Sequence, residues 1–219
     1  MGQTIVEKIA KSHLMEGPAR PLRAGDVVSL RPRHVLTHDN TAAVMKKFAA
    51  IGAQRVADER QPVFVLDHDI QNRSEENLAK YDAIAAFALE QGIHFYPAGT
   101  GIGHQIMMSH GYVTPGALAV ASDSHANMYG ALGALGTPVV RTDAAAIWAT
   151  GEFWWQIPRT IQVVLRGRLR PGVTGKDVII TLCGLYNRGE VLNAALEFSG
   201  DGVATLGMVP RGVELPVAR

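Results

Sequence analysis

The chain has 219 residues, which is enough for one sizeable α/β domain, or for one domain and the beginning of another. Its 21 basic and 20 acidic residues give a net charge of +1, and the basic residues are scattered along the chain. This balance argues against a nucleic-acid partner. No apolar run approaches the roughly 18 residues that span a bilayer, and the start lacks a secretory signal, so we expect no membrane segment.

Predicted strands and helices alternate along most of the chain. Apolar runs typical of strands occur at residues 26–32, 62–69, 93–99, 117–125 and 161–169. Helical spacing of apolar residues occurs at residues 4–12, 41–53, 74–92, 142–158 and 171–186. The alternation predicts a three-layer α/β/α domain with a mostly parallel sheet and helices on both faces.

Capping residues support two of the predicted helices. Thr4 and Glu7 have the spacing of a capping box, and Ser74 and Gly92 bound the helix over residues 74–92. Cys183 is predicted to be a small core residue, since a single cysteine allows no disulfide within the chain.

Three parts of the chain are interpreted more coarsely. Residues 191–200 are ambiguous between helix and strand, and from residue 207 the sequence has no helical period. The tryptophans are predicted to be core or subunit-interface anchors, not a cofactor box; they are Trp148, Trp154 and Trp155.

Polar side chains gather where the predicted strands end. In open parallel sheets, ligands bind beyond the carboxyl ends of the strands. This edge of the sheet is expected to carry Asp67, His68, His104, Asp123, Ser124 and His125. His38 and Asp39 lie at a further strand-to-helix junction, where Asp39 or Asn40 is expected to cap the helix.

Three histidines have a carboxylate one or two positions away. The pairs are Asp67 with His68, Asp123 with His125, and His38 with Asp39. A carboxylate bonded to an imidazole fixes its tautomer and favours the charged ring, which makes a proton donor near neutral pH. Such groups around one cavity suit the acid-catalysed loss of hydroxide, whereas any one of them alone is more often a capped turn or a surface histidine.

Two other kinds of site stay open at this point. The acids and histidines include ligands for a divalent ion, but their spacing matches no zinc signature. The segment GTGIG follows a strand, with Asp123 about 20 residues on, as in dinucleotide-binding proteins. Its spacing is G-x-G-x-G, however, where that fingerprint has G-x-G-x-x-G.

The motifs together resemble the cluster-bearing large subunit of the aconitase superfamily, and most closely its homoaconitase branch. The resemblance covers residues 3 to 206, and its main segments are VLTHDNTAAVM, VLDHDIQN, GTGIGHQIM and ASDSHANMYGALGALGTPVV. It implies a domain over residues 1–206 of the aconitase N-terminal type, followed by an irregular tail over residues 207–219.

The resemblance implies a hydro-lyase that removes and re-adds water on a 2-hydroxy tricarboxylate. For the homoaconitase branch the substrate is homocitrate or homoaconitate, in lysine biosynthesis through α-aminoadipate. The implied catalytic residues are Asp67, His68, His104, Asp123, His125 and Glu197, with His38 and Ser124 in substrate binding. In this family Asp67 and His68 would protonate the departing hydroxyl, and Glu197 would partner an active-site histidine.

The family's cofactor is a [4Fe-4S] cluster held by three cysteines, and this chain has one cysteine. We therefore expect a missing C-terminal segment or a small swivelling-domain subunit to complete the site, and little activity from the chain alone. The alternatives are the large subunit of 3-isopropylmalate dehydratase and a non-catalytic fragment that binds a carboxylate or a partner. The expected compartment is the cytoplasm, or the mitochondrion for a fungal protein, although no clear transit peptide is present.

Overall fold

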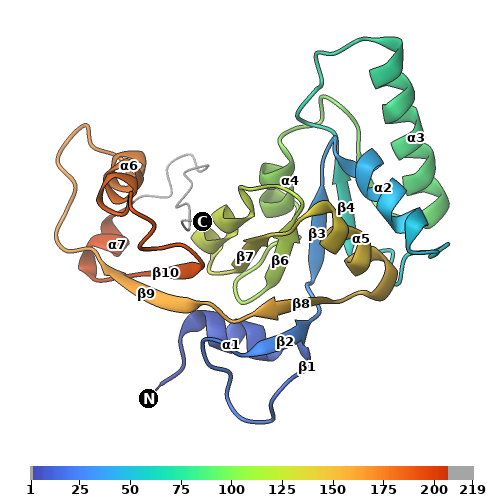
Figure 1. Ribbon diagram of the computed structural model, residues 1–219. Coiled ribbons are helices and arrows are strands. Elements are labelled where there is room, and N and C mark those ends of the chain that lie inside the picture. Colours follow the sequence, from blue (N-terminus) through green and yellow to red (C-terminus); the bar gives the residue numbers. More distant parts are fainter. Residues whose placement is uncertain (1, 207–219) are drawn as a thin grey trace.

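The centre of the molecule is a five-stranded parallel sheet (Figure 1). The computed structural model describes residues 2–206. The strand order is β5-β4-β3-β6-β7, and every neighbouring pair is parallel. The strands are β3 (His34–Thr37), β4 (Pro62–Val65), β5 (His94–Tyr96), β6 (Leu118–Ala121) and β7 (Leu135–Pro138). The three strands that carry the motifs, β4, β3 and β6, are therefore adjacent.

Helices cover both faces of this sheet, as Figure 1 shows. One face packs against α2 (Thr41–Ala50), α3 (Glu75–Gln91) and α5 (Arg141–Thr150), and the other against α4 (Gly103–Ser109) and the 3-10 helix η1 (Ala126–Leu132). Alternate residues of one strand enter the two cores: Val35 joins the first core and Leu36 the second. The predicted three-layer α/β/α architecture is confirmed.

The predicted caps form as expected. Helix α1 (Ile5–Ser12) begins with a capping box, in which Thr4 Oγ1 accepts from the Glu7 amide and the Glu7 carboxylate accepts from the Thr4 amide. Helix α3 begins at Ser74, whose Oγ accepts from the Asn77 amide, and ends at Gly92 in the left-handed region.

The strand predicted over residues 26–32 is present but belongs to a different sheet. We expected the strand over residues 26–32 to be the one that leads to His38. Instead β3 leads to His38, and β2 (Val27–Leu30) belongs to a separate antiparallel sheet with β1 (Leu14–Glu16) and β8 (Phe153–Gln156). The physical reason is the burial pattern: Val27 is 61% exposed and Val28 is 3% exposed, as in a strand with one solvated face.

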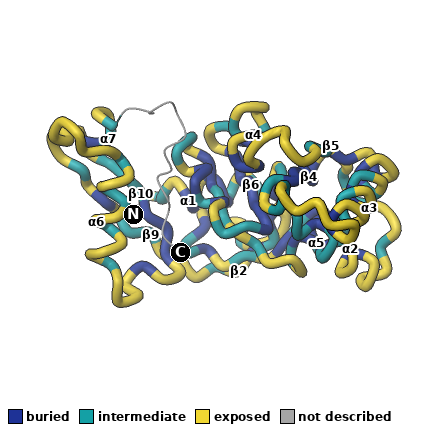
Figure 2. The backbone as a smooth tube through the Cα atoms, turned by 90° about the horizontal axis from the view of Figure 1, so that it is seen from above, coloured by how far each residue is buried: buried dark blue, intermediate teal, exposed yellow. Residues whose placement is uncertain are grey.

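A smaller unit follows β8. It contains β9 (Arg159–Val164) and β10 (Ala194–Ser199), which pair in parallel, and the helices α6 (Gly175–Leu185) and α7 (Asp201–Thr205). The ambiguous segment 191–200 thus contains a strand. Helix α6 has no buried residue, and its exposed surface is visible in Figure 2.

The environment of α6 corrects the prediction for Cys183, which is exposed and not a core residue. The three tryptophans differ in burial. Trp148 is 1% exposed, Trp155 is partly buried against the first core, and Trp154 is 70% exposed. The predicted irregular tail, residues 207–219, lies outside the described residues. Among the described helices, none has the length and apolar character required to cross a membrane.

Candidate functional site

The site lies where β3, β4 and β6 end. Because the three strands are parallel neighbours, the turns that follow them, residues 38–40, 67–69 and 122–125, meet at one edge of the sheet. Asn40 links two of these turns, since its Nδ2 donates to the Ser122 carbonyl at 2.7 Å. The predicted convergence of acids and histidines at this edge is what the structure contains.

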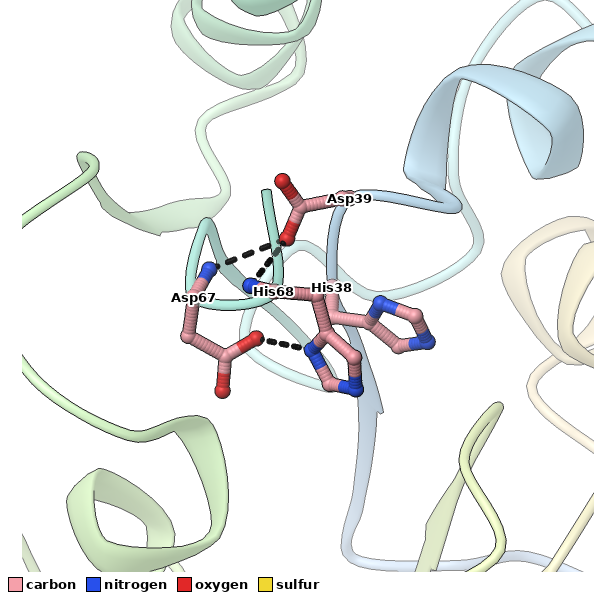
Figure 3. Close-up of side chains that lie close together, drawn as sticks. All are labelled: His38, Asp39, Asp67 and His68. Atoms are coloured by element: carbon pink, nitrogen blue, oxygen red, sulfur yellow. Dashed lines mark hydrogen bonds and ion pairs between the residues drawn. The ribbon is translucent and has the colours of Figure 1, made fainter. Parts of the chain in front are cut away.

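Asp39 organises the turn after β4 (Figure 3). Its Oδ2 accepts from the backbone amides of Asp67 at 3.0 Å and His68 at 2.8 Å, and its Oδ1 accepts from the Asp69 amide at 3.2 Å. The Tyr81 hydroxyl donates to the same carboxylate. Burial raises the pKa of Asp39, but these hydrogen bonds outweigh burial and lower the pKa below its ordinary value.

These contacts correct two expectations for the turn after β3. Asp39 does not cap α2, and neither does Asn40, which precedes α2 without a side-chain cap bond. Asp39 is also not the partner of His38, because its oxygens are taken by Tyr81 and the turn amides. The sequence did not single out Tyr81, which reaches Asp39 from α3.

His68 lies between two carboxylates. Its Nδ1 donates to Asp67 Oδ1 at 2.5 Å, and its Nε2 lies 3.4 Å from Asp123 Oδ2. Burial lowers the pKa of His68, but the hydrogen bond and charge of Asp67 and the charge of Asp123 raise it above the ordinary value. The pair forms because β4 ends at Val65, so both side chains of the following turn reach one side.

His38 stacks on the His68 ring, with ring centroids 3.9 Å apart and planes 22° apart (Figure 3). Its Nε2 lies 3.9 Å from Asp123 Oδ2, and its buried Nδ1 has no hydrogen-bond partner among the described residues. Burial, together with the nearby charge of His68, lowers the pKa of His38. The expected pairing of His38 with Asp39 was therefore wrong, and the pKa of His38 is lowered beside a ring whose pKa is raised.

Asp123 is the hub of the site. Its Oδ1 accepts from His104 Nε2 at 2.7 Å, from His125 Nδ1 at 3.0 Å and from the His125 amide at 2.8 Å, while Oδ2 faces His68 and His38. Burial raises the pKa of Asp123, but the hydrogen bonds from His125 and His104 hold it well below its usual range. One ionised carboxylate thus contacts four histidines.

His104 is buried, whereas the side chain of His125 is 66% exposed. His104 Nδ1 lies in hydrogen-bond contact with the Tyr129 hydroxyl at 2.9 Å. Tyr129 is fully buried, and burial raises its pKa well above the ordinary value. The sequence did not single out Tyr129, because the short 3-10 helix η1 has no regular apolar period.

Gly103, the residue before His104, binds the second carboxylate oxygen of Asp67. The Gly103 amide donates to Asp67 Oδ2 at 2.5 Å. A Cβ at Gly103 would lie 3.0 Å from this oxygen and 3.3 Å from a Leu36 methyl, so a larger residue would make these side chains shift. The dinucleotide alternative is not supported, because a carboxylate of the chain occupies the place of a phosphate at this helix start.

Ser124 and Glu197 line the same groove as His38 and Asp123. This groove, of about 1850 Å³, lies between the central sheet and the β9–β10 unit. Ser124 Oγ is 3.4 Å from His125 Nδ1. The Glu197 carboxylate, on β10, accepts from the amides of Ile5 at 2.6 Å and Val6 at 3.3 Å. Its contacts in the described structure are thus with the start of α1.

The comparisons with known proteins agree with this arrangement. The model of the aconitase family (aconitate hydratase) matches residues 7–212. The chain belongs to the aconitase family. It is 58% identical over 212 residues to the mitochondrial homoaconitase of Cryptococcus neoformans var. neoformans serotype D. It is 57% identical over 210 residues to that of Yarrowia lipolytica, and 54% identical over 217 residues to that of Neurospora crassa.

These alignments cover most of this chain and a minor part of each relative. They include 95%, 95% and 99% of the chain, but 29%, 31% and 28% of the three relatives. The chain therefore spans about three tenths of the length of the curated relatives it matches.

An iron-sulfur cluster and a single metal ion need different ligands from this chain. A [4Fe-4S] cluster requires about three thiolates, and the one cysteine, Cys183, lies exposed on α6. The chain by itself therefore does not fit the cluster. Two groups of side chains are close enough for a single ion: His38, Asp39, Asp67 and His68, and His104, Asp123 and His125. Most of their facing atoms, however, are engaged in hydrogen bonds with the chain itself.

Proposed function

We propose that this chain supplies the acid and substrate-binding part of a homoaconitase-type hydro-lyase. The observation that carries the proposal is His68, which two carboxylates surround and whose pKa is raised. A partly exposed imidazolium stacked on His38, which lines the groove, is a suitable proton donor near neutral pH. The similarity to homoaconitases supports homocitrate, homoaconitate and homoisocitrate as the substrates.

In the dehydration direction the carbon–oxygen bond of the substrate breaks, and its electron pair leaves with the oxygen. The His68 Nε2 proton moves to this oxygen and releases it as water, so that His68 becomes neutral. A base outside the residues assigned here takes the proton of the neighbouring carbon, and the electron pair of that carbon–hydrogen bond forms the double bond. Asp67 keeps its hydrogen bond to Nδ1 and holds the ring in place.

Substrate carboxylates have cationic and hydrogen-bonding partners in the same groove. Ser124 lines the groove and offers a hydroxyl, while His68, next to His38, and the exposed His125, next to Ser124, would offer a positive charge and a ring nitrogen. His38, neutral and stacked beside His68, is positioned to contact the part of the substrate next to the leaving hydroxyl. We propose His38 as a residue that distinguishes substrates, and Glu197 as the partner of an active-site histidine in the complete enzyme.

The complete enzyme contains more than this chain in our proposal. Family membership supports a [4Fe-4S] cluster, whose thiolates come from a C-terminal segment or another subunit, and a small swivelling-domain partner. Residues 1–206 form one aconitase-type region in this proposal. The relatives' names support a mitochondrial location over a cytoplasmic one.

The test is hydration of homoaconitate by anaerobically reconstituted enzyme, followed by the absorbance of the unsaturated acid. The chain is assayed alone and with a small-subunit and C-terminal partner, as wild type, H68Q and the control H110Q. We expect turnover only with the partner, a fall of about 100-fold or more in H68Q, and normal turnover in H110Q. Turnover of isopropylmalate instead would assign the isopropylmalate dehydratase branch. Equal rates in H68Q and wild type would contradict the role of His68.

A further inference from the structure

Among the described residues, Tyr129 makes one polar contact, which is with His104 in the site. Its side chain lies in the second core, among residues of β3, β4, β6 and α4. Among the described residues its hydroxyl has a single hydrogen-bond partner, His104 Nδ1 at 2.9 Å. A fully buried phenol that contacts only one ring nitrogen acts on that nitrogen, because a buried hydroxyl without a partner is costly.

The sequence holds Tyr129 in this position through a close approach of two backbones. Helix η1 lies on β7, where a Cβ at Gly136 would be 2.0 Å from the Ala126 carbonyl oxygen and 3.0 Å from the Tyr129 Cβ. Only glycine permits this approach. The backbone and Cβ of Tyr129 are therefore placed by packing against β7.

The direction of the hydrogen bonds follows from the partners of His104. Asp123 is ionised, so its carboxylate only accepts, and His104 Nε2 must carry the proton that it receives. Tyr129 keeps its own proton, because burial disfavours the phenolate. The hydroxyl proton then has one acceptor, the lone pair of His104 Nδ1.

We propose that Tyr129 is a positioning residue, which holds His104 as the neutral ring protonated at Nε2 and thereby orients Asp123 toward His68. With Nδ1 occupied by the phenol, Nε2–H points at Asp123 Oδ1 and holds that oxygen. The other oxygen, Oδ2, then faces His68 Nε2 at 3.4 Å and His38 Nε2 at 3.9 Å. Tyr129 thus acts on His68 through the side chains of His104 and Asp123.

The direct test is the protonation of the His104 ring nitrogens, measured by long-range ¹⁵N–¹H correlation on the labelled chain. H104Q identifies the His104 signals. We expect an unprotonated, hydrogen-bonded Nδ1 and a protonated Nε2 in wild type. In Y129F, which keeps the ring that packs in the core, the Nδ1 signal is expected to move toward that of a free lone pair. The control is Y112F, which removes the hydroxyl of another tyrosine that packs on the same core and contacts Tyr96. In Y112F the Nδ1 signal of His104 is expected to stay where it is in wild type.

A protonated Nδ1 in wild type, or an Nδ1 signal unchanged in Y129F, would overturn the proposal. The catalytic consequence rests on the proposed hydro-lyase function, whereas the ring-nitrogen signals need no turnover. In the reconstituted enzyme we expect kcat to fall about tenfold in Y129F with KM nearly unchanged. If the ring-nitrogen signals behave as expected but no variant affects turnover, the positioning role stands and the proposed function fails. A fall in kcat equal to that of Y112F would reduce Tyr129 to a packing role.

Discussion

His68 and His104 both contact Asp123, but they lie in opposite surroundings. The side chain of His68 is 47% exposed and lies between Asp67 and Asp123, whereas His104 is buried between Asp123 and Tyr129. Two carboxylates favour the charged ring, and a carboxylate with a phenol favours a neutral one. The second partner of each ring, not the shared carboxylate, therefore decides what each histidine can do.

The comparison also explains why the proposed proton donor is the half-exposed histidine. A charged ring is tolerated at His68 because solvent and two acids surround it, while a charge on His104 would leave the Tyr129 proton without an acceptor. One carboxylate thus supports a charged and a neutral histidine at the same time. Variants that exchange or remove the second partners test this division.

The largest effect is expected from D67N, which takes one of the two carboxylates from His68. The amide lacks the negative charge that raises the pKa of His68, and its NH₂ group would face the Gly103 amide, which is also a donor. We expect the hydration rate of the reconstituted enzyme to fall about 100-fold. The exposed D82N serves as a control, and a D67N enzyme with the wild-type rate would contradict the assignment.

Asp123→Asn is expected to lower stability because three donors converge on Asp123 Oδ1. The neutral amide accepts less well, and its NH₂ group meets donors wherever it points. A fall of about 2 kcal/mol in the free energy of unfolding is expected, as for a buried donor that loses its partner. Urea unfolding followed by circular dichroism measures it. A loss below half of this value would mean that the histidines find other acceptors.

Gly103→Ala sharpens the comparison by disturbing only the His68 side. The new methyl group would press on Asp67 Oδ2 and Leu36, and we expect a loss of about 1 kcal/mol in stability. The matched control is Gly184→Ala in α6, where a Cβ meets nothing within 4 Å and helix propensity favours alanine. If thermal unfolding finds both variants equally stable, the contact at Gly103 is not tight.

The smallest effect is expected from Y81F, which removes one of the donors to Asp39. Burial and the Asp39 hydrogen bond raise the pKa of Tyr81 to about 12. Without the hydroxyl the pKa of Asp39 should rise, while the three backbone amides still hold the turn. We expect a loss of about 0.5–1 kcal/mol in urea unfolding. A larger loss would show that the amides depend on Tyr81.

Much of the fold was predictable because it follows from local patterns. Apolar runs mark strands β4, β5 and β6, although β3 was not predicted, and Ser74 and Gly92 mark the ends of α3. The convergence of the acids and histidines followed from the parallel sheet alone. The prediction for residues 26–32 failed because nearby strands can join different sheets, which the local sequence does not determine.

The partners within the site were less predictable, since they come from distant parts of the chain. Tyr129 is 25 positions from His104, and Tyr81 is 42 positions from Asp39. The pairing of His38 with Asp39 was predicted because the two residues are adjacent in sequence. It does not form, because the Asp39 carboxylate binds the backbone amides of the turn after β4. Cys183 was predicted to be a core residue because it has no disulfide partner in the chain, yet no residue of α6 is buried.

The central claim is that the surroundings of His68 raise the pKa of its ring, and an NMR titration of this ring in the chain tests it most directly. A raised pKa stabilises the fold below about pH 6.5, and this contribution is lost as the pH rises through the folded-state pKa. We predict that His68 titrates above about 6.5, with stability that falls over the same range in wild type and less in H68Q. A His68 that titrates at or below about 6.5 would contradict the claim and remove the proton donor from the proposed reaction.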